Sequence, residues 1–450
     1  MRTLVAVSTV VVSLAACSSA AAKAPWSASA RLDRTVPASC DLAQNLIPAG
    51  CFGEPGTRVA ISRKGAVIVV WTDLRQRVKA AVGDRRGRFG PTRMLGLGLR
   101  PSVTIDAAGN ATAAWTAAHE LRFARLPAGA RRFGRSAPLA APSTKDGDDF
   151  VHLLARPGGG ATAVYERAGR DPAGRYATRL GAVELARTGS PSPPTVLGPG
   201  AISAVAASPA GDIVVCCEST EVSPPPPAEP PPTRTVTLLV RSAIGAWTRL
   251  SQALPRDTDI ETVATNAGAI ALGTVDVVNG GDAGTLGRPG AARGPLHGPF
   301  GLVRPAFVRE PGKAFGAVAG IDGSARTVLA YQEKTSASAF SRAAPLYAMS
   351  ARPDLPFRRR TQLDSTRVTE PLVQSLGAGA LVAWDRGSTW GVALERAGRF
   401  RRIGSPSGGP GELGRDAITN RALATAGAYA ALAWEDEAGD IRASVARLSP

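Results

Sequence analysis

A short apolar unit recurs along the chain and determines the expected architecture. Each copy begins near a glycine, continues with small and branched apolar residues, and ends at an aromatic residue, as in GAVIVVW (65–71), GNATAAW (109–115) and GGATAVY (159–165). Weaker copies end at Cys217, Thr274, Tyr331, Trp384 and Trp434. The spacing runs from 44 residues (71 to 115) to 57 residues (217 to 274), which indicates a repeat protein rather than several unrelated domains.

Three further segments in each repeat are typical of strands. An alternating stretch such as PSVTID (101–106) precedes a turn rich in Asp, Gly and Asn, and a third segment such as RVKAAV (77–82) follows the aromatic residue. The outer segment carries an aromatic residue six positions before a leucine, at 89–95, 133–139 and 357–363. The unit at 65–71 is apolar on both faces, so we expect this second strand to be covered on both sides by neighbouring sheets.

Eight repeats of this kind predict an all-β fold, a β-propeller of eight four-stranded antiparallel blades. The fifth repeat, with Thr274 at the aromatic position, is the weakest, so seven blades are the alternative. The last repeat has strand patterns at 418–424, 429–434 and 441–448 but no fourth strand. Residues 26–32 (WSASARL) have the missing aromatic-to-leucine spacing. We therefore predict that the N-terminal strand completes the last blade and removes an exposed sheet edge.

The N-terminus has the pattern of an export signal. Arg2 precedes an apolar stretch (4–16) that ends in Leu14-Ala15-Ala16-Cys17. This tetrapeptide resembles the lipobox of bacterial lipoproteins, in which the cysteine becomes the lipidated first residue. The expected organisation is a signal peptide (1–16), a lipidated linker (17–25) beginning at Cys17, and one propeller domain (26–450) anchored to the cell membrane by lipid. The alternative is an ordinary cleaved signal and a secreted protein.

The other four cysteines fall into two pairs. Cys40 and Cys51 bracket a short segment, and in an oxidising compartment we expect a local disulfide between them. Cys216 and Cys217 are adjacent in an apolar run, and neighbouring strand residues point to opposite faces, so two buried thiols are favoured over a bond between them. Neither pair has the spacing of a zinc site.

The repeat resembles the Trp-containing repeats of secreted bacterial β-propellers and, distantly, sialidase-type blades. DAAGNATAAW (106–115) has a rhythm similar to the Asp-box of sialidases but lacks its residue order, and the sialidase arginine triad cannot be assigned. The resemblance therefore implies a fold and not an activity.

Acidic residues recur just after the aromatic position of the repeat. They are Asp73, Glu166, Glu218, Asp276, Glu333, Asp385, Glu435 and Asp436. In a propeller this position lies on the face where second and third strands connect, so the carboxylates could ring the channel mouth and bind a cation, a basic peptide or sugar hydroxyls. The alternative is that they cap solvated turns.

Other candidate features are weaker. SPPPPAEPPP (223–232) predicts a stiff polyproline II arm, and the Gly-rich stretch 279–294 predicts a mobile loop. The formal net charge is +17, but the arginines are scattered and an exported protein meets little nucleic acid, so we expect no nucleic-acid partner. The chain has only three histidines, which are dispersed, and we expect no metal and no cofactor.

The preferred interpretation is a monomeric, non-catalytic exported lipoprotein. It would be a binding or scaffold module that recognises a protein or an envelope glycan through one face of the propeller. The alternative is a carbohydrate-active hydrolase or lyase that uses paired carboxylates among Asp73, Glu166, Glu333 and Asp385.

Overall fold

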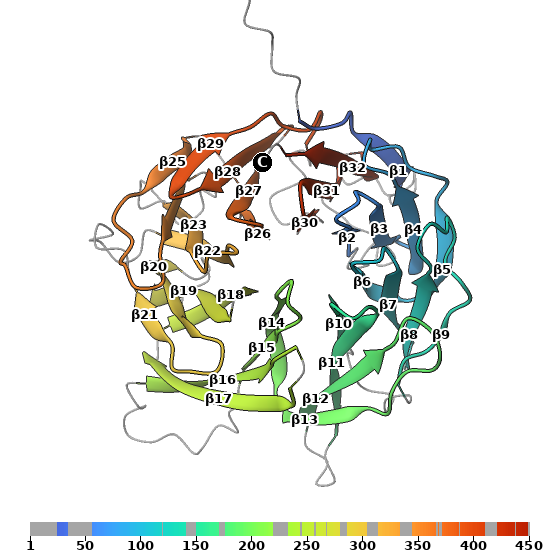
Figure 1. Cartoon of the computed structure of the whole chain (residues 1–450), viewed down its shortest axis with the longest axis horizontal. Coiled ribbons are helices and arrows are strands. Elements are labelled where there is room, and N and C mark those ends of the chain that lie inside the picture. The colour runs from blue at the N-terminus through green and yellow to red at the C-terminus, as the bar shows by residue number, and fades with distance from the viewer. Residues whose placement is uncertain are drawn as a thin grey trace, which may run out of the picture.

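The computed structural model describes most of the chain after residue 24. The described residues are 25–34, 56–118, 120–140, 150–170, 176–218, 233–243, 245–255, 258–266, 268–279, 286–303, 314–333, 344–365, 368, 371–386, 388–409, 421–436 and 438–448. They form eight four-stranded antiparallel blades arranged in a ring (Figure 1). The protein is an eight-bladed β-propeller, as the repeat predicts.

The first four blades follow one another along the chain, and each begins with its innermost strand. Their strands are β2 (Arg58–Ile61), β3 (Val67–Thr72), β4 (Arg77–Gly83) and β5 (Arg93–Leu97) in blade 1; β6 (Leu99–Ile105), β7 (Ala111–Ala117), β8 (Glu120–Leu126) and β9 (Ala137–Pro138) in blade 2; β10 (Phe150–Ala155), β11 (Ala161–Arg170), β12 (Tyr176–Leu185) and β13 (Thr195–Pro199) in blade 3; and β14 (Ala201–Ala207), β15 (Ile213–Glu218), β16 (Thr233–Arg241) and β17 (Trp247–Pro255) in blade 4.

The remaining blades continue the same order, except that the last takes its outer strand from the N-terminus. Their strands are β18 (Thr258–Asn266), β19 (Ala269–Asn279), β20 (Leu286–Pro295) and β21 (Gly301–Val303) in blade 5; β22 (Ala314–Ile321), β23 (Thr327–Glu333), β24 (Leu346–Ala351) and β25 (Thr361–Asp364) in blade 6; β26 (Leu372–Leu376), β27 (Gly379–Asp385), β28 (Trp390–Arg396) and β29 (Arg399–Arg402) in blade 7; and β30 (Arg421–Ala426), β31 (Tyr429–Glu435), β32 (Asp440–Arg447) and β1 (Ala30–Arg34) in blade 8.

The chain connections define two faces of the ring. Loops from second to third strands, and from each blade to the next, lie on what we call the top face. Hairpins from first to second and from third to fourth strands lie on the bottom face.

The second strands are buried on both faces, as the continuous apolar pattern predicts. Every residue of β3 is buried, and so is every residue of β27. The aromatic residue at the end of the unit reaches the preceding blade: the Trp115 Nε1 group donates to the backbone oxygen of Leu97, and Trp384 Nε1 donates to Asp364 Oδ2 at 2.8 Å. The recurring aromatic position therefore joins blades together.

The outer strands begin later than the aromatic-to-leucine pattern suggests. The aromatic residue precedes the described strand by four positions in each case, and the leucine is the third position counted from the strand start. The aromatic residue and strand start are Trp26 and Ala30, Phe89 and Arg93, Phe133 and Ala137, and Phe357 and Thr361. Each aromatic residue thus lies in the segment that precedes the strand. The pattern nevertheless identifies the outer strand correctly.

Closure of the ring joins the two ends of the chain. Strand β1 pairs with β32 in an antiparallel register, with Ala30 opposite Ala443, and Trp26 forms a bridge to Ala446. Trp26 is only 6% exposed and belongs to the core between blades 7 and 8. The backbone oxygen of Leu32 accepts a hydrogen bond from Thr92 Oγ1 at 2.7 Å, which ties β1 to blade 1. The predicted N-terminal closure is confirmed.

The expectation that the Gly-rich stretch 279–294 is a mobile loop is wrong for most of its length. Its residues from Leu286 onward form β20, the third strand of blade 5, and not a loop. A Cβ on Gly294 would lie 2.3 Å from the backbone oxygen of Pro299, and one on Gly290 would lie 2.9 Å from Thr274 Oγ1. Close packing therefore requires glycine at positions where local sequence preference argues against a strand.

Hydroxyl groups connect the innermost strands around the axis. Figure 1 shows β2, β6, β10, β14, β18, β22, β26 and β30 nearest the centre, where each presents a sheet edge. The Ser102 Oγ accepts from the backbone N–H of Leu153 at 2.9 Å, and Thr262 Oγ1 accepts from that of Ala319 at 2.8 Å. Each bond joins neighbouring blades and supplies an edge N–H with a partner that the sheet itself does not provide.

Replacing Thr262 with valine should therefore destabilise the ring. The valine has the same shape but no acceptor, so the N–H of Ala319 loses its partner at a cost of about 1–3 kcal/mol. The Thr262→Ser variant keeps the hydroxyl and serves as the control. Urea unfolding followed by circular dichroism checks the prediction; equal midpoints for the two variants would contradict it.

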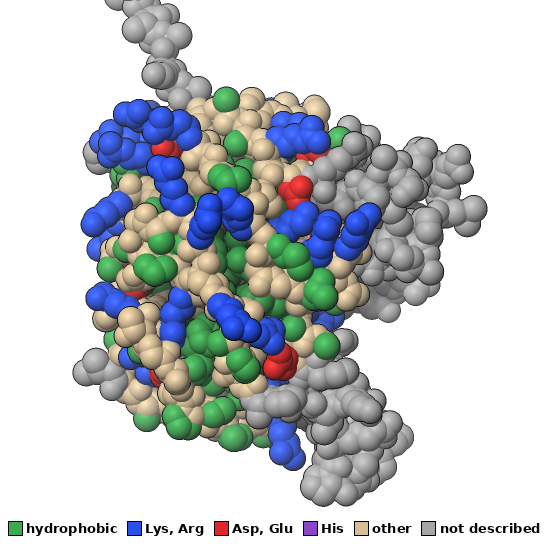
Figure 2. Space-filling model, turned by 90° about the vertical axis from the view of Figure 1, so that its right-hand side faces the viewer, with side chains coloured by type: hydrophobic (Ala, Val, Ile, Leu, Met, Phe, Trp, Pro, Cys, Tyr) green, Lys and Arg blue, Asp and Glu red, His purple; other side chains and the backbone are tan. Residues whose placement is uncertain are grey.

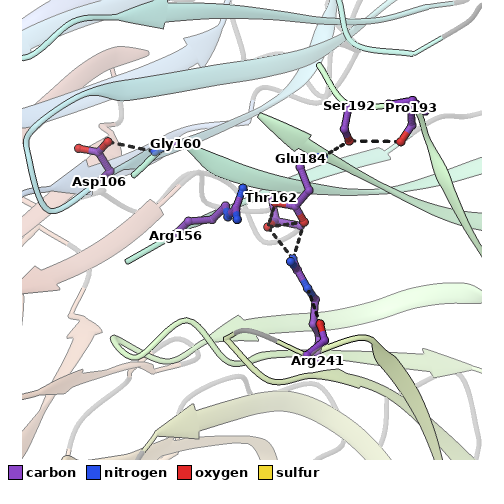
Figure 3. A network of polar contacts seen from close by, with 9 residues as sticks. Asp106, Arg156, Gly160, Thr162, Glu184, Ser192, Pro193 and Arg241 are labelled. Carbon is purple, nitrogen blue, oxygen red and sulfur yellow. Dashed lines mark hydrogen bonds and ion pairs between the residues drawn. The ribbon is translucent and has the colours of Figure 1, made fainter. Parts of the chain in front are cut away.

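Charged side chains add a second set of contacts between blades near the bottom face (Figure 3). The Glu184 carboxylate in blade 3 forms ion pairs with Arg156, at 2.9 Å, and with Arg241 of blade 4. Asp106 of blade 2 accepts from the backbone N–H of Gly160 in blade 3 at 3.0 Å. These carboxylates therefore fix blades 2, 3 and 4 relative to one another.

Several predicted features lie outside the described residues. These are the signal peptide with Cys17, the expected Cys40–Cys51 disulfide, and the proline-rich segment 223–232. Cys216 is buried, at 1% exposure.

Candidate functional site

The predicted acidic residues occupy equivalent places at the top ends of the second strands. Glu166, Glu218, Asp276 and Glu333 each pair with the first residue of their blade's innermost strand. The four acidic residues therefore lie on one face of the ring and at the same height, as the periodicity of the repeat implies. For Glu218 and Asp276 the structure describes the backbone and not the side chain.

Asp73 closes the turn between β3 and β4. Its Oδ1 accepts from the backbone N–H groups of Arg75 at 3.0 Å and Arg77 at 2.9 Å, and its Oδ2 accepts from Arg77 Nε at 2.7 Å. Lys79 Nζ lies 3.0 Å from the same carboxylate. Burial alone would raise the pKa of Asp73, but the hydrogen bonds from Arg77 and Lys79 outweigh it and hold the pKa below its usual value. Asp73 is a buried turn cap.

The same turn recurs on both faces of the propeller. Asp436 accepts from the backbone N–H groups of Ala438 and Asp440, at 3.0 Å each, which repeats the spacing of two and four residues seen at Asp73. Three aspartates of bottom-face turns show this spacing as well: Asp84, Asp106 and Asp322. An acidic residue after a strand is therefore a general device for closing turns in this chain.

The other predicted carboxylates contact protein groups or are buried. Glu166 Oε2 accepts from the backbone N–H of Ile202 in the next blade at 2.8 Å, and Glu333 forms an ion pair with Arg360. Asp385 and Glu435 are 1% and 7% exposed. The ligand-binding role of these acids stays a prediction. The acids whose partners are described also stabilise turns or contacts between blades.

A second group of residues lies at the top end of the innermost strands, and the sequence analysis missed it. Arg58 starts β2, Arg100 lies near the start of β6, and Phe150 and His152 lie on β10. We call these four residues of blades 1, 2 and 3 the axial mouth. Strands β2 and β6, and strands β6 and β10, are in contact, so ring closure brings the four together.

Arg58 is exposed although it lies on β2, the innermost strand of blade 1, which Figure 1 shows close to the centre of the ring. Its Nη1 donates to the backbone oxygen of Thr57 at 3.0 Å, and no carboxylate among the described residues pairs with it. Burial by the surrounding protein lowers its pKa. The Arg58 side chain is thus exposed to solvent and yet close to enough protein for its pKa to be lowered.

The neighbours of Arg58 are arranged around this charge. Burial, together with repulsion from Arg58, lowers the pKa of His152 to about 4, so His152 is neutral at pH 7. The Arg100 guanidinium lies 3.8 Å from the centre of the Phe150 ring, a cation–π contact, and Arg100 has a φ of 52°, which is rare for a residue other than glycine.

β-Bulges occur at this same level in four innermost strands. The register shifts near the top end of β6, β14, β18 and β22, and the shifts in β14 and β18 re-aim the exposed side chains of Ser203 and Glu261. Bulges of this kind are enriched beside binding sites. No sequence signal marked them, because a bulge is defined only against its partner strand.

Two surface hollows lie elsewhere on the described part of the molecule. One, of about 440 Å³, lies between blades 7 and 8 and is lined by Ser29, Ser388, Ser407, Gly408, Gly409, Asp436, Ala438 and Arg442. The other, of about 350 Å³, lies on the outer wall of blades 1 and 2 and is lined by Arg93, Met94, Leu95, Arg132, Phe133, Gly134, Arg135 and Ser136. Figure 2 shows this wall, on which basic side chains are common and acidic ones are few.

Within the described ranges, no three His, Cys, Asp or Glu side chains are grouped so that they could hold a metal ion. None of the described segments is a helix with the length and apolar character that crossing a membrane requires.

Comparison with known proteins supports the fold alone. The sequence matches no family model and no curated protein. Among solved structures, the polysaccharide lyase Uly1 is similar with a TM-score of 0.50 at 9% identity, over 93% of this chain and 97% of that chain. A puromycin hydrolase is similar with a TM-score of 0.48 at 14% identity, over 89% of this chain and 61% of that chain. A subtype N11 neuraminidase-like protein is similar with a TM-score of 0.36 at 9% identity, over 94% of this chain and 96% of that chain.

Proposed function

We propose that this protein is an exported, lipid-anchored binding module whose top face recognises a protein or a glycan of the cell envelope. The observation that carries the proposal is the use of the top-face carboxylates. Asp73, Asp436 and Glu166 are engaged with backbone N–H groups, so they hold the turns after β3 and β31 and the contact between blades 3 and 4 in place. A rigid scaffold that presents irregular loops is a common arrangement for recognition.

The proposed location rests on the N-terminal sequence and agrees with the charge of the outer wall. A lipid at Cys17 would hold the domain close to the membrane, because only seven residues lie between Cys17 and Pro25, and the eight Cα–Cα steps can span at most about 28 Å. Met94 and Leu97 are 54% and 62% exposed on the basic wall of blades 1 and 2. Arginines beside exposed apolar side chains suit a surface that lies near anionic lipid headgroups.

The enzyme alternative needs two carboxylates that face a substrate at a suitable separation. The hydrogen bonds of Asp73 and Glu166 to the protein itself weigh against that role. The release of new reducing ends or unsaturated sugars from envelope polysaccharide would favour the enzyme.

A capture experiment with matched variants tests the binding module. The top variant carries Arg75→Glu and Ser388→Arg, and the bottom variant carries Arg63→Glu and Ala128→Arg; all four positions are exposed, and both variants change the net charge equally. We expect the wild type and the bottom variant to retain an envelope glycan or protein, and the top variant to retain at least about fivefold less. Equal retention by the two variants, or none by the wild type, would overturn the proposal.

The anchor has its own test. A Cys17→Ser variant expressed in a host with a lipoprotein pathway should leave the membrane fraction, while the wild type incorporates labelled palmitate. An unlabelled wild type would point instead to an ordinary cleaved signal.

A further inference from the structure

We propose that the axial mouth is an anion-binding site and that its ligand is a glycan carrying carboxylate groups. The inference rests on the proposed function, since it names the ligand class of the same top face. Arg58 is the principal contact. Its guanidinium offers a planar set of donors that matches a carboxylate in two parallel hydrogen bonds.

The first argument is the electrostatic state of Arg58. The protein surrounds this cation closely enough to lower its pKa, yet within the described part of the chain no carboxylate pairs with it. Desolvation of an unpaired charge is costly. An anionic group that entered the mouth would provide the missing counter-charge.

The second argument is the direction of charge across the ring. Arg58 belongs to blade 1, and the exposed acid Glu261 belongs to blade 5, which is the opposite blade of eight. Arg100 and His152 follow Arg58 on blades 2 and 3. The basic side of the mouth therefore covers the sector of blades 1 and 2, with the neutral His152 beside it on blade 3, and an anion would be drawn to that sector and away from Glu261.

The third argument concerns the neutral partners, which favour a sugar over an acidic peptide. His152 is uncharged because its pKa is about 4, so each ring nitrogen has one defined role, as donor or as acceptor. The Ser203 hydroxyl, which donates to the backbone oxygen of Cys216 at 3.2 Å and can still accept, and the exposed amide of Gln374 lie on innermost strands of other blades. Neutral groups that both donate and accept suit sugar hydroxyls, whereas a strongly acidic peptide would be better served by further cations.

The test is direct binding of defined probes to the mature domain. Trigalacturonate is the anionic sugar, its methyl ester is the neutral sugar of the same shape, and a short polyglutamate peptide is the non-sugar anion. We expect trigalacturonate to bind, its methyl ester to bind at least about tenfold more weakly, and affinity to fall as salt is raised. Calorimetry at low and moderate ionic strength measures all three.

Arg58→Met removes the charge and keeps a long apolar side chain, and we expect it to lower the affinity for trigalacturonate by about tenfold or more. The control is Lys64→Met, which removes one charge from the exposed bottom turn of the same blade and should leave affinity unchanged. Arg58→Lys keeps the charge but not the planar set of donors that forms two parallel hydrogen bonds, and it should retain part of the affinity. Each variant is accepted only if its thermal melt matches the wild type; the lysine variant then carries the test if the methionine variant does not fold.

The outcomes separate this inference from the proposed function. Unchanged affinity in Arg58→Met, or no binding of trigalacturonate by the wild type, overturns the anion site even where envelope capture through the top face succeeds. Tighter binding of polyglutamate than of trigalacturonate overturns the glycan assignment. Loss of envelope capture in the top variant together with tight trigalacturonate binding supports both.

Discussion

Replacing Gly391 with alanine should cost about 3 kcal/mol or more in the free energy of unfolding. Gly391 of β28 lies opposite Trp384 of β27, and a Cβ at this position would lie 2.0 Å from Cε2 of the indole ring. Trp384 is completely buried and donates to Asp364 Oδ2, so the ring has nowhere to move without breaking that bond. Chemical denaturation followed by tryptophan fluorescence measures the loss.

A matched glycine provides the control. Gly301 in β21 also has an ordinary φ, and a Cβ there would meet no atom within 4 Å. Gly301→Ala should therefore change stability by no more than about 0.5 kcal/mol. A Trp384→Leu substitution added to Gly391→Ala should recover part of the loss, because the two residues compete for one space. Similar stabilities for the two alanine variants would show that the close approach of ring and glycine is not a constraint.

The packing of Trp384 against Gly391 also shows why so much of the fold could be predicted. The apolar unit, the turn glycines and the aromatic position recur because every blade solves the same packing problem between two neighbours. Eight repeats, their strand order and the N-terminal closure could all be read from that recurrence. The first residue of each outer strand could not be predicted, since Phe89 and Trp26 lie four residues ahead of the strands they mark. Strand β20 was missed because its glycines reflect contacts with Pro299 and Thr274, which are visible only in three dimensions.

The candidate site was predictable only in part. The recurring acids were visible in the sequence, but Asp84 and Asp322 show that the same residue closes turns on the opposite face. The local sequence cannot separate a turn cap from a ligand. Arg58, Arg100 and His152 carry no motif, and they become neighbours only because three strands from different repeats meet at the axis. A site made by ring closure leaves no local signal.

Ring closure itself leads to the second large effect, the removal of the N-terminal strand. Deleting residues 24–36 should lower the melting temperature by roughly 5–10 °C. The deletion exposes the edge of β32 and removes the buried Trp26, whose loss alone is worth about 3–5 kcal/mol. It also removes the bond from Thr92 to Leu32 that joins blade 8 to blade 1. Differential scanning calorimetry of the two mature chains makes the comparison.

A peptide added in trans turns this prediction into a test of mechanism. A peptide of residues 25–36 should bind the open edge of β32 in the truncated protein and restore most of the lost stability, since strand addition uses main-chain hydrogen bonds and a side-chain anchor. The same peptide with Trp26→Ala should restore much less. If both peptides act equally, the indole is not the anchor, and if the truncated protein melts like the full domain, the ring does not depend on this strand. The expected ranking follows from burial: Trp26 lies in the core shared by blades 7 and 8, so closing the last blade also seals the contact between it and its neighbour.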